Sequence, residues 1–202
     1  HRFAAHRCFV TSLNQPPQTK PAIRSILIAL MLAIFLGALD QTIVAVSMPA
    51  ISTQFDNVSL LAWVISGYMV AMTVAVPIYG KLGDLYGRRR MILTGISLFT
   101  LASIACALAQ DMQQLVLARV LQGIGAGGMV SIPFIIYADI YPNPAQRARA
   151  LGWVTAFYTL STVVGPLVGG WLVDALSWHW VFFINLPIGL LVILMVMLFF
   201  KE

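Results

Sequence analysis

Long runs of apolar residues, separated by short polar segments, dominate this chain. Six runs each hold about 20 mostly apolar residues, the length that an α-helix needs to cross the hydrocarbon core of a bilayer. Backbone amides find no partners in lipid, so each run is expected to be helical. The pattern therefore predicts an all-α membrane protein with six transmembrane helices. The predicted spans are Ser25–Ile51, Leu60–Tyr79, Met91–Ala109, Leu115–Tyr137, Ala150–Val173 and Val181–Phe200.

The composition excludes a water-soluble domain. Of the 202 residues, 60% are hydrophobic and 9% are charged, against about 25% charged residues in soluble domains. The net charge of +5 does not indicate a nucleic-acid partner, because the basic residues cluster between the apolar runs and form no stripe interleaved with aromatic residues. Cys8 and Cys106 lie in unlike surroundings, so we expect no disulfide, no metal site and no cofactor. The lipid bilayer is the expected partner.

The basic residues also predict the orientation of the chain. All but one of the 12 Lys and Arg residues lie before the first span, in the loops after spans two and four, or after span six. The opposite loops carry Asp56, Asp111 and Asp174 and no basic residue. Because basic loops stay cytoplasmic, we expect a multi-pass plasma-membrane protein with its N-terminus and Glu202 in the cytoplasm. Residues 1–24 hold no sustained apolar run and are predicted to form a disordered cytoplasmic tail.

Two charged residues fall inside the apolar runs, where a charge costs about 2.5–3.5 kcal/mol on insertion scales. Asp40 lies far from both ends of the first span, so its carboxyl group needs a polar partner, a polar cavity or a proton. Asp40 is therefore a candidate proton carrier, although a structural hydrogen bond to a helix backbone would also explain it. Arg119 lies nearer the outer end of the fourth span, where its long side chain could instead reach the membrane surface.

Glycines that follow Arg119 favour a functional interpretation of the fourth span. The segment Gln122–Gly128 holds four glycines, and each costs up to about 1 kcal/mol relative to alanine in a helix. This cost indicates that another backbone or a substrate approaches closely, and Gly123 and Gly127 form a G-x-x-x-G face. The segment also matches the dinucleotide-binding fingerprint by letters, but no strand precedes it. The sequence has neither an ATP-binding loop nor a catalytic constellation, so we expect no enzyme.

The loop after the second span resembles a motif of the major facilitator superfamily. That motif is G-x-L-x-D-x-x-G-R-(K/R), and Asp84 and Arg88 within it are four residues apart, close enough to share a helix face. A positive-inside anchor would explain the arginines but neither the glycines nor Asp84. The matching residues are Gly80, Leu82, Asp84, Gly87, Arg88 and Arg89.

Further motifs resemble the fourteen-spanner drug:proton antiporters of that superfamily. Leu39–Ile51 resembles their first-helix motif L-D-x-T-I-V-N-V-A-L-P-x-I, and Arg119–Gly125 resembles their fourth-helix motif R-x-x-Q-G-x-G. Trp178–Gly189 resembles the sixth-helix motif W-R-W-x-F-x-I-N-x-P-x-G. The fifth span resembles the antiporter motif G-x8-G-x3-G-P-x2-G-G. Its matching residues are Gly152, Gly165, Pro166, Gly169 and Gly170.

Three positions depart from these motifs. Ala45 replaces the usual Asn, which would alter a polar contact beside Asp40. Ser161 replaces a Gly, which would loosen close packing in the fifth span. His179 replaces the usual Arg.

The resemblance implies a transporter of twelve or fourteen helices, with two six-helix halves around a central cavity. Residues 25–202 would form the N-terminal half, a pair of inverted three-helix repeats, and the missing C-terminal half would be its partner. The first and fourth spans would be symmetry mates, so Asp40 and Arg119 would both face the cavity, and Gln41 and Gln122 would contact the substrate. The implied activity is proton-coupled efflux of small amphipathic compounds by alternating access.

The resemblance also implies separate roles for the motifs. Asp40 would take and release the proton with the help of Arg119, while Gly165 and Pro166 would shape a helix contact that limits leak. A cytoplasmic gate would consist of the loop motif together with Asp139. The residues of this gate are Gly80, Asp84, Gly87, Arg88, Arg89 and Asp139.

Within the gate, we expect Arg88 to pair with Asp139. Asp84 is expected to have no partner in this half alone and to face the other half of the transporter. Alternative functions stay open at this point. They are a transporter of the same fold that is specific for a sugar, siderophore or amino acid, and a truncated half that does not transport. A membrane enzyme is the least favoured class.

Overall fold

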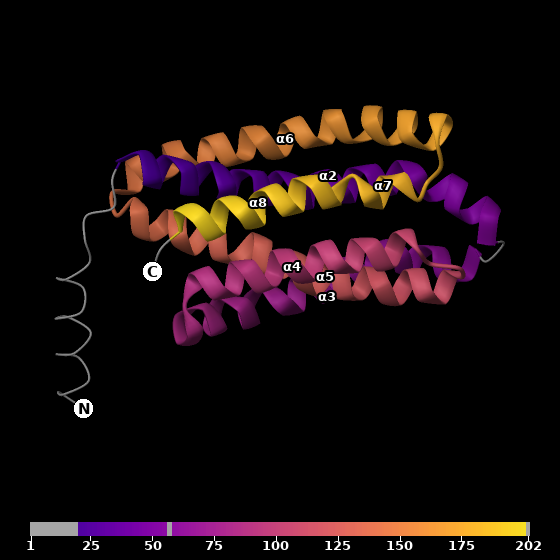
Figure 1. Cartoon of the computed structure of the whole chain (residues 1–202), viewed down its shortest axis with the longest axis horizontal. Coiled ribbons are helices and arrows are strands. Elements are labelled where there is room, and N and C mark those ends of the chain that lie inside the picture. The colour runs from indigo at the N-terminus through magenta and orange to yellow at the C-terminus, as the bar shows by residue number, and fades with distance from the viewer. Residues whose placement is uncertain (1–19, 56–57, 201–202) are drawn as a thin grey trace.

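Six membrane-length helices make up the structure, as the hydrophobic pattern predicts. The computed structural model describes residues 20–55 and 58–200, and Figure 1 shows a bundle of long helices lying side by side. Six helical segments of the described residues are long and apolar enough to cross a membrane. The helices are α2 (Lys20–Phe55), α3 (Val58–Tyr86), α4 (Arg88–Ala107), α5 (Met112–Ile140), α6 (Pro144–Ala175), α7 (Trp180–Phe183) and α8 (Asn185–Phe199).

The helices extend beyond several of the predicted spans. α2 begins at Lys20, so residues 20–24, which were assigned to the tail, are helical. The rest of the predicted tail, residues 1–19, lies outside the described residues. Hydrophobicity marks where a helix crosses the hydrocarbon core, whereas the backbone hydrogen bonds of the helix continue into the polar flanks.

The sixth span is one helical segment, Trp180–Phe199, as expected, with a local irregularity near its start. α7 ends at Phe183, and α8 begins at Asn185. Pro187 lies in the first turn of α8. Because proline has no backbone N–H, it cannot donate to the carbonyl group of Phe183 four residues earlier. Ile184, between the two assigned helices, keeps helical φ and ψ angles of −61° and −24°. Asn185 follows it in the interior of the bundle and is 0% exposed.

The first three spans (α2, α3 and α4) and the last three (α5, α6 and α7–α8) pack into each other. α5, the first helix of the second set, packs against α3 and α4, while α2, the first helix of the first set, packs against α6 and α8. In Figure 1, α2, α6 and α8 accordingly lie on one side and α3, α4 and α5 on the other. Contacts of α2 with α5 and of α4 with α8 join the two groups. α2 and α5 are the most buried of the six spans.

The glycines of α5 allow two helices to approach it closely. A Cβ atom on Gly123 would collide with the backbone oxygen of Tyr68 in α3. On the adjacent face, a Cβ on Gly125 would lie 2.5 Å from the backbone nitrogen of Phe99 in α4. The close neighbours that the sequence predicted for these glycines are therefore protein backbones.

The contact between α2 and α6 is equally close. A Cβ on Gly165 would collide with the side chain of Thr42, and one on Gly169 would lie 3.3 Å from the Cα atom of Ile43. The Thr42 hydroxyl group donates a hydrogen bond to the carbonyl oxygen of Ser161 at 3.2 Å. Ser161 is fully buried, so α6 lies close to α2 here although serine replaces the glycine of the motif.

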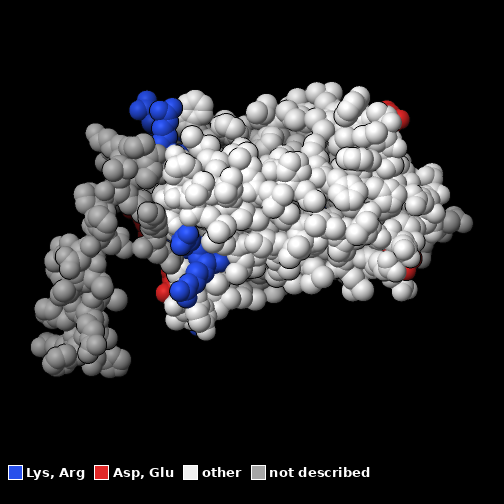
Figure 2. Space-filling view, viewed as in Figure 1, with Lys and Arg blue, Asp and Glu red and all other residues white. Residues whose placement is uncertain are grey.

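Charged side chains gather at the ends of the bundle. Figure 2 shows Lys and Arg atoms at one end, where the α3–α4 and α5–α6 connections lie. Asp111, the N-cap of α5, and Asp174, near the end of α6, lie at the opposite end. Asp56, the third acidic residue assigned to that side, lies outside the described residues. The long sides of the bundle in this view present mainly uncharged atoms, as a lipid-facing surface requires.

Replacement of Gly123 by alanine should destabilise the bundle. The new Cβ would meet the backbone of Tyr68, which cannot move without shifting α3. Overpacking of this kind costs about 1–3 kcal/mol. Gly152→Ala is the matched control, because a Cβ there meets nothing within 4 Å and alanine favours the helix. Thermal unfolding of the purified chain in detergent compares the two, and equal melting temperatures would contradict the close α3–α5 contact.

Candidate functional site

Asp40 and Arg119 form an ion pair in the interior of the bundle. Arg119 Nη1 lies 2.6 Å from Asp40 Oδ2, and the two residues are 0% and 1% exposed. Removing one member of such a buried pair costs about 3–5 kcal/mol, because the other charge stays buried without a partner. The pair therefore holds α2 against α5.

The other oxygen of the Asp40 carboxyl group accepts two more hydrogen bonds. Gln122 Nε2 donates to Oδ1 at 2.9 Å, and Asn185 Nδ2 donates to the same atom at 2.7 Å. Together with Arg119, three side chains from two other helices donate to this carboxyl group. Hydrogen bonds from such donors stabilise an ionised carboxylate, so the geometry is that of a charged Asp40.

Arg119 points into the bundle, so the alternative that it reaches the membrane surface is wrong. Its Nε donates to the backbone oxygen of Val64 in α3 at 3.2 Å, and its Nη1 also donates to Gln122 Oε1 at 2.7 Å. The ring of Tyr68 lies over the guanidinium group, with 4.0 Å between the ring centroid and Cζ. This cation–π contact covers one face of the guanidinium group.

Polar groups of α4 complete the cluster. Ser103 Oγ accepts a hydrogen bond from Gln122 Nε2 at 2.8 Å, and Cys106 Sγ donates to Gln122 Oε1 at 3.5 Å. Asn185 Nδ2 also approaches Ser103 Oγ, at 3.4 Å, while Asn185 Oδ1 has no hydrogen-bond partner among the described residues. We call these residues the polar cluster. Its members are Asp40, Tyr68, Ser103, Cys106, Arg119, Gln122 and Asn185, from α2, α3, α4, α5 and α8.

Sequence reasoning missed part of this cluster. Tyr68, Ser103 and Asn185 were not among the predicted site residues. Asn185 offered a signal, because it is an amide within an apolar run and part of the sixth-helix motif. Ser103 and Tyr68 offered almost none, since serine and tyrosine occur at many uncharged positions of transmembrane helices.

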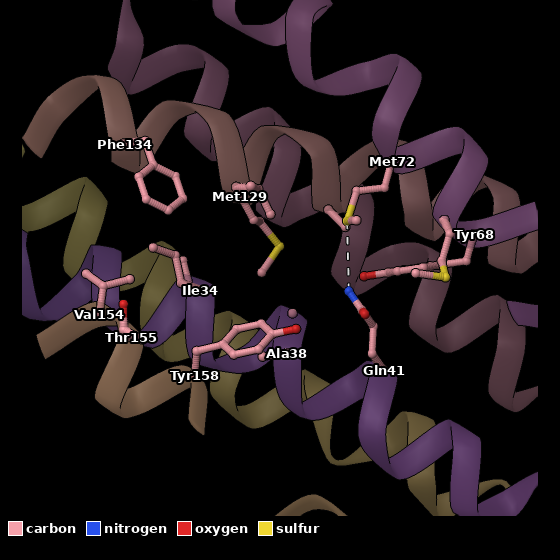
Figure 3. A pocket seen from close by; sticks show the side chains of 15 residues that line it. Ile34, Ala38, Gln41, Tyr68, Met72, Met129, Phe134, Val154, Thr155 and Tyr158 are labelled. Carbon is pink, nitrogen blue, oxygen red and sulfur yellow. Dashed lines mark hydrogen bonds between the residues drawn. The ribbon is translucent and has the colours of Figure 1, made fainter. Parts of the chain in front are cut away.

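A cavity of about 400 Å³ lies beside the polar cluster, lined by residues of α2, α3, α5 and α6. Figure 3 shows Gln41 pointing into it, toward Met72. Asp40, Arg119 and Gln122 do not line this cavity and are buried, and their position at a central cavity between the two halves stays a prediction. They are buried because their polar groups satisfy one another. Tyr68 alone belongs both to the lining and to the polar cluster.

The cavity wall is uncharged and mostly apolar. No Asp, Glu, Lys or Arg is among its lining residues in the described chain. Met69, Met72 and Met129 contribute flexible, polarizable side chains that adapt to differently shaped ligands. The described residues also hold no group of three or more His, Cys, Asp or Glu side chains able to bind a metal ion.

The loop between α3 and α4 contains one predicted contact and one unexpected contact. Gly87 separates the helices with a φ of 94°, a conformation that favours glycine. Arg88 forms an ion pair with Asp139 at the end of α5, as predicted. Asp84 was expected to have no partner in this half, but its Oδ1 lies 3.8 Å from Arg88 Nη2, because the turn at Gly87 folds the two residues together. Its side chain is nevertheless 67% exposed.

The remaining gate residues have simpler surroundings. Arg89 Nη2 donates to the backbone oxygen of Met197 at 3.0 Å and so joins the start of α4 to α8. A Cβ on Gly80 would lie 3.8 Å from Ile135, an ordinary contact. The packing in this structure therefore gives no reason for a glycine at position 80.

The antiporter-like residues of α6 divide into two groups. Gly165 and Gly169 contact α2, whereas Pro166 is exposed. A Cβ on Gly152 or Gly170 would meet nothing within 4 Å. Among these residues, only Gly165 and Gly169 therefore form a close helix contact within the described part of the chain.

Two of the departures from the family motifs lie away from the polar cluster. Ala45 is exposed, so its replacement of Asn does not alter a contact of Asp40 in this structure. The ring of His179 stacks on Trp178 with 3.9 Å between centroids, in the connection between α6 and α7. Burial lowers the pKa of His179, so this position carries less positive charge at neutral pH than the arginine of the motif.

Comparison with known proteins identifies the family. A sequence model of the Major Facilitator Superfamily matches residues 30–202 of the chain. The chain belongs to the major facilitator superfamily. This superfamily and the transporters named below point to transport and not to enzymatic catalysis.

Several curated relatives in the major facilitator superfamily are named as drug or efflux transporters. Multidrug resistance protein 3 of Bacillus subtilis is 43% identical over 177 residues, which are 88% of this chain and 34% of that protein. Multidrug transporter protein MdtP of the same organism is 42% identical over 91% of this chain and 34% of its own length. Efflux pump dotC of Dothistroma septosporum is 39% identical over 90% of this chain and 32% of its own length. The chain thus spans about a third of the length of these relatives.

Solved structures confirm the superfamily fold. A D-xylose-proton symporter matches with a TM-score of 0.74 and 17% identity, over 87% of this chain and 48% of that chain. An inward-open structure of the xylose transporter XylE from E. coli matches with a TM-score of 0.69, also at 17% identity, over the same shares of the two chains. At this identity, the similarity shows the fold alone.

Arg119→Leu should destabilise the chain by about 3–5 kcal/mol, because Asp40 would stay buried without its counter-charge. The double variant Asp40→Asn with Arg119→Leu removes both charges and should recover a large part of that loss. The free energy of unfolding of the purified chain in detergent is measured for Arg119→Leu, for Asp40→Asn and for the double variant. If the effects of the two single variants simply add in the double variant, the residues are not coupled.

Proposed function

We propose that this chain is the N-terminal half of a proton-coupled exporter of small amphipathic compounds, which works by alternating access. The observation that supports this most directly is the buried Asp40–Arg119 pair beside an uncharged, methionine-rich cavity. The names of the curated relatives, which are multidrug and efflux transporters, point to the same kind of activity. The C-terminal half of the transporter would complete the cavity.

The proton would act on the ion pair. Protonation of Asp40 removes its negative charge and therefore its attraction to Arg119. Arg119 would then keep its hydrogen bonds to Gln122 and Val64 and its contact with the Tyr68 ring. The junction of α2 and α5 would thus have two arrangements, one for each protonation state of Asp40. A two-state element of this kind is what physical coupling between a proton and a conformational change requires.

Substrate would bind in the cavity and the proton in the adjacent cluster. The cavity wall offers apolar area, adaptable methionine side chains and a small number of polar groups, which suits amphipathic molecules of varied shape. A metabolite carrier for sugars or amino acids would need several hydrogen-bonding groups in its wall. The sparse polar lining of this half favours efflux over that alternative.

We also propose the orientation that the basic residues predict. The end of the bundle with the α3–α4 and α5–α6 connections would be cytoplasmic, because it carries the Lys and Arg residues. The N-terminus and Glu202 would lie on the same side, and the plasma membrane would be the site of action. In this orientation, the Arg88–Asp139 pair lies at the cytoplasmic surface.

Asp40→Asn should abolish proton-driven export in the full-length transporter while leaving membrane insertion intact. The amide keeps the size of the carboxyl group but cannot carry the proton. Transport of an uncharged amphipathic fluorescent dye into everted vesicles, driven by an imposed pH gradient, measures the effect.

Asp174→Asn is the matched control for this experiment, because Asp174 is an exposed carboxylate at the end of α6. It should transport like the wild type. Wild-type rates from Asp40→Asn would refute proton coupling through Asp40. A panel that includes sugars, siderophores and amino acids would identify a metabolite carrier, and a full-length protein that moves none of these compounds would refute the exporter assignment.

The Arg88–Asp139 pair would serve as a cytoplasmic latch. It joins the start of α4 to the end of α5, and Asp84 beside it is largely exposed and free to face the other half of the transporter. We propose that Asp84 contacts a helix N-terminus of that half, where a carboxylate gains roughly 0.3–1 kcal/mol. This contact would favour the outward-open state by holding the halves together on the cytoplasmic side.

A double-mutant cycle tests the latch. Arg88→Ala and Asp139→Ala should each lower the export rate of the full-length transporter several-fold, and the double variant should be little worse than either alone. The initial export rate in everted vesicles is measured for the wild type and for each of the three variants. Independent, multiplying losses of rate would show that the residues do not act together.

A further inference from the structure

Tyr68 separates the cavity from the ion pair. One face of its ring lies over the Arg119 guanidinium group, 4.0 Å from Cζ. The same residue lines the cavity together with Gln41. Figure 3 shows the Tyr68 side chain extending from α3 toward the Gln41 amide. A molecule in the cavity would therefore meet Tyr68 before it could reach the charges.

The hydroxyl group of Tyr68 lacks a hydrogen-bond partner. Tyr68 is 0% exposed, and its Oη lies beside the Gln41 side chain without a hydrogen bond of good geometry to any group of the described residues. A buried hydroxyl group without a partner costs about 1–3 kcal/mol. Buried polar atoms of folded proteins are otherwise almost always paired, which indicates that this hydroxyl group receives its partner from a molecule in the cavity.

Gln41 provides a second polar group at the same place. Its Nε2 makes a weak contact, 3.9 Å from the sulfur atom of Met72, and its side chain lies beside the Tyr68 hydroxyl group, so the rest of its hydrogen-bonding capacity is left for a ligand. The other polar residues of the lining differ. The Thr155 hydroxyl group already donates to the Leu151 carbonyl oxygen, and Tyr158 is 47% exposed. Tyr68 and Gln41 are thus the polar end of an otherwise apolar cavity, with Gln41 the more exposed of the two.

We propose that Tyr68 and Gln41 recognise an uncharged hydrogen-bonding group, such as a hydroxyl, carbonyl or amide, on a ligand whose remaining surface is apolar. This inference rests on the proposed transport function and specifies the class of substrate. No charge in the part of the lining that this half supplies compensates a charged group, and burial of an unpaired charge is costly.

Tyr68→Phe is the central variant, because it removes the hydroxyl group and keeps the ring over Arg119. The probes are 2-naphthol and 2-methylnaphthalene, which have nearly the same size and differ by a hydroxyl group against a methyl group. Equilibrium dialysis of the purified full-length transporter, against protein-free micelles, measures both affinities. Tyr68→Phe should weaken binding of 2-naphthol about three- to tenfold, the effect of one lost hydrogen bond, and change binding of 2-methylnaphthalene less than twofold.

Tyr86→Phe is the matched control, because Tyr86 is an exposed tyrosine at the end of the same helix. It should bind both probes like the wild type. Gln41→Leu provides a second test that does not depend on the folding of Tyr68→Phe, and it should also weaken 2-naphthol selectively.

Two results would overturn the inference while leaving the transport function intact. In the first, Tyr68→Phe and Gln41→Leu weaken the binding of both probes equally. In the second, neither variant weakens the binding of either probe. Both results require a wild type that binds the probes and exports a dye. A wild type that neither binds the probes nor exports any compound would overturn the proposed function, and this inference with it.

Discussion

A carboxylate and a guanidinium group held 2.6 Å apart inside an apolar bundle constrain every helix around them. Neither charge is tolerated in lipid without compensation, and the pair alone leaves hydrogen-bonding positions open on both groups. α3 provides a backbone oxygen and an aromatic ring, α4 a serine, α5 a glutamine and α8 an asparagine. The polar cluster therefore fixes the depth and rotation of five helices at once, more sharply than apolar packing does.

Close helix packing is the geometric condition for this cluster. Gly123 directly follows Gln122 and allows α3 to approach α5 backbone to backbone. Gly165 leaves room for the Thr42 side chain of α2 against α6, two residues after Asp40. Larger residues at these positions would separate the helices and lengthen the hydrogen bonds of the cluster. The glycine motifs and the charged motifs of the sequence thus describe one arrangement.

Much of the fold could be predicted because a bilayer permits few solutions. The six spans, the glycine faces of α5 and α6 and the Arg88–Asp139 contact follow from hydrophobic length, residue size and charge. The sequence did not reveal that Asp40 and Arg119 bond directly and are sealed from the cavity, because hydrophobic periodicity does not set how far one helix is rotated or shifted relative to another. The same limit hid Ser103 and Tyr68. For Asp84, the spacing of four residues allowed the contact with Arg88 that the structure shows, but the sequence did not decide between this contact and a partner in the other half.

The interlocked order of the helices has a consequence for synthesis in the cell. Asp40 leaves the ribosome 79 residues before Arg119 and 145 residues before Asn185. At about 5–20 residues per second, roughly 4–16 s pass before its counter-charge exists. α2 must therefore enter the membrane before any of its stabilising partners, with a carboxyl group that lipid disfavours. The insertion machinery has to shelter this helix, or insert it as the neutral acid, until the second set of spans arrives.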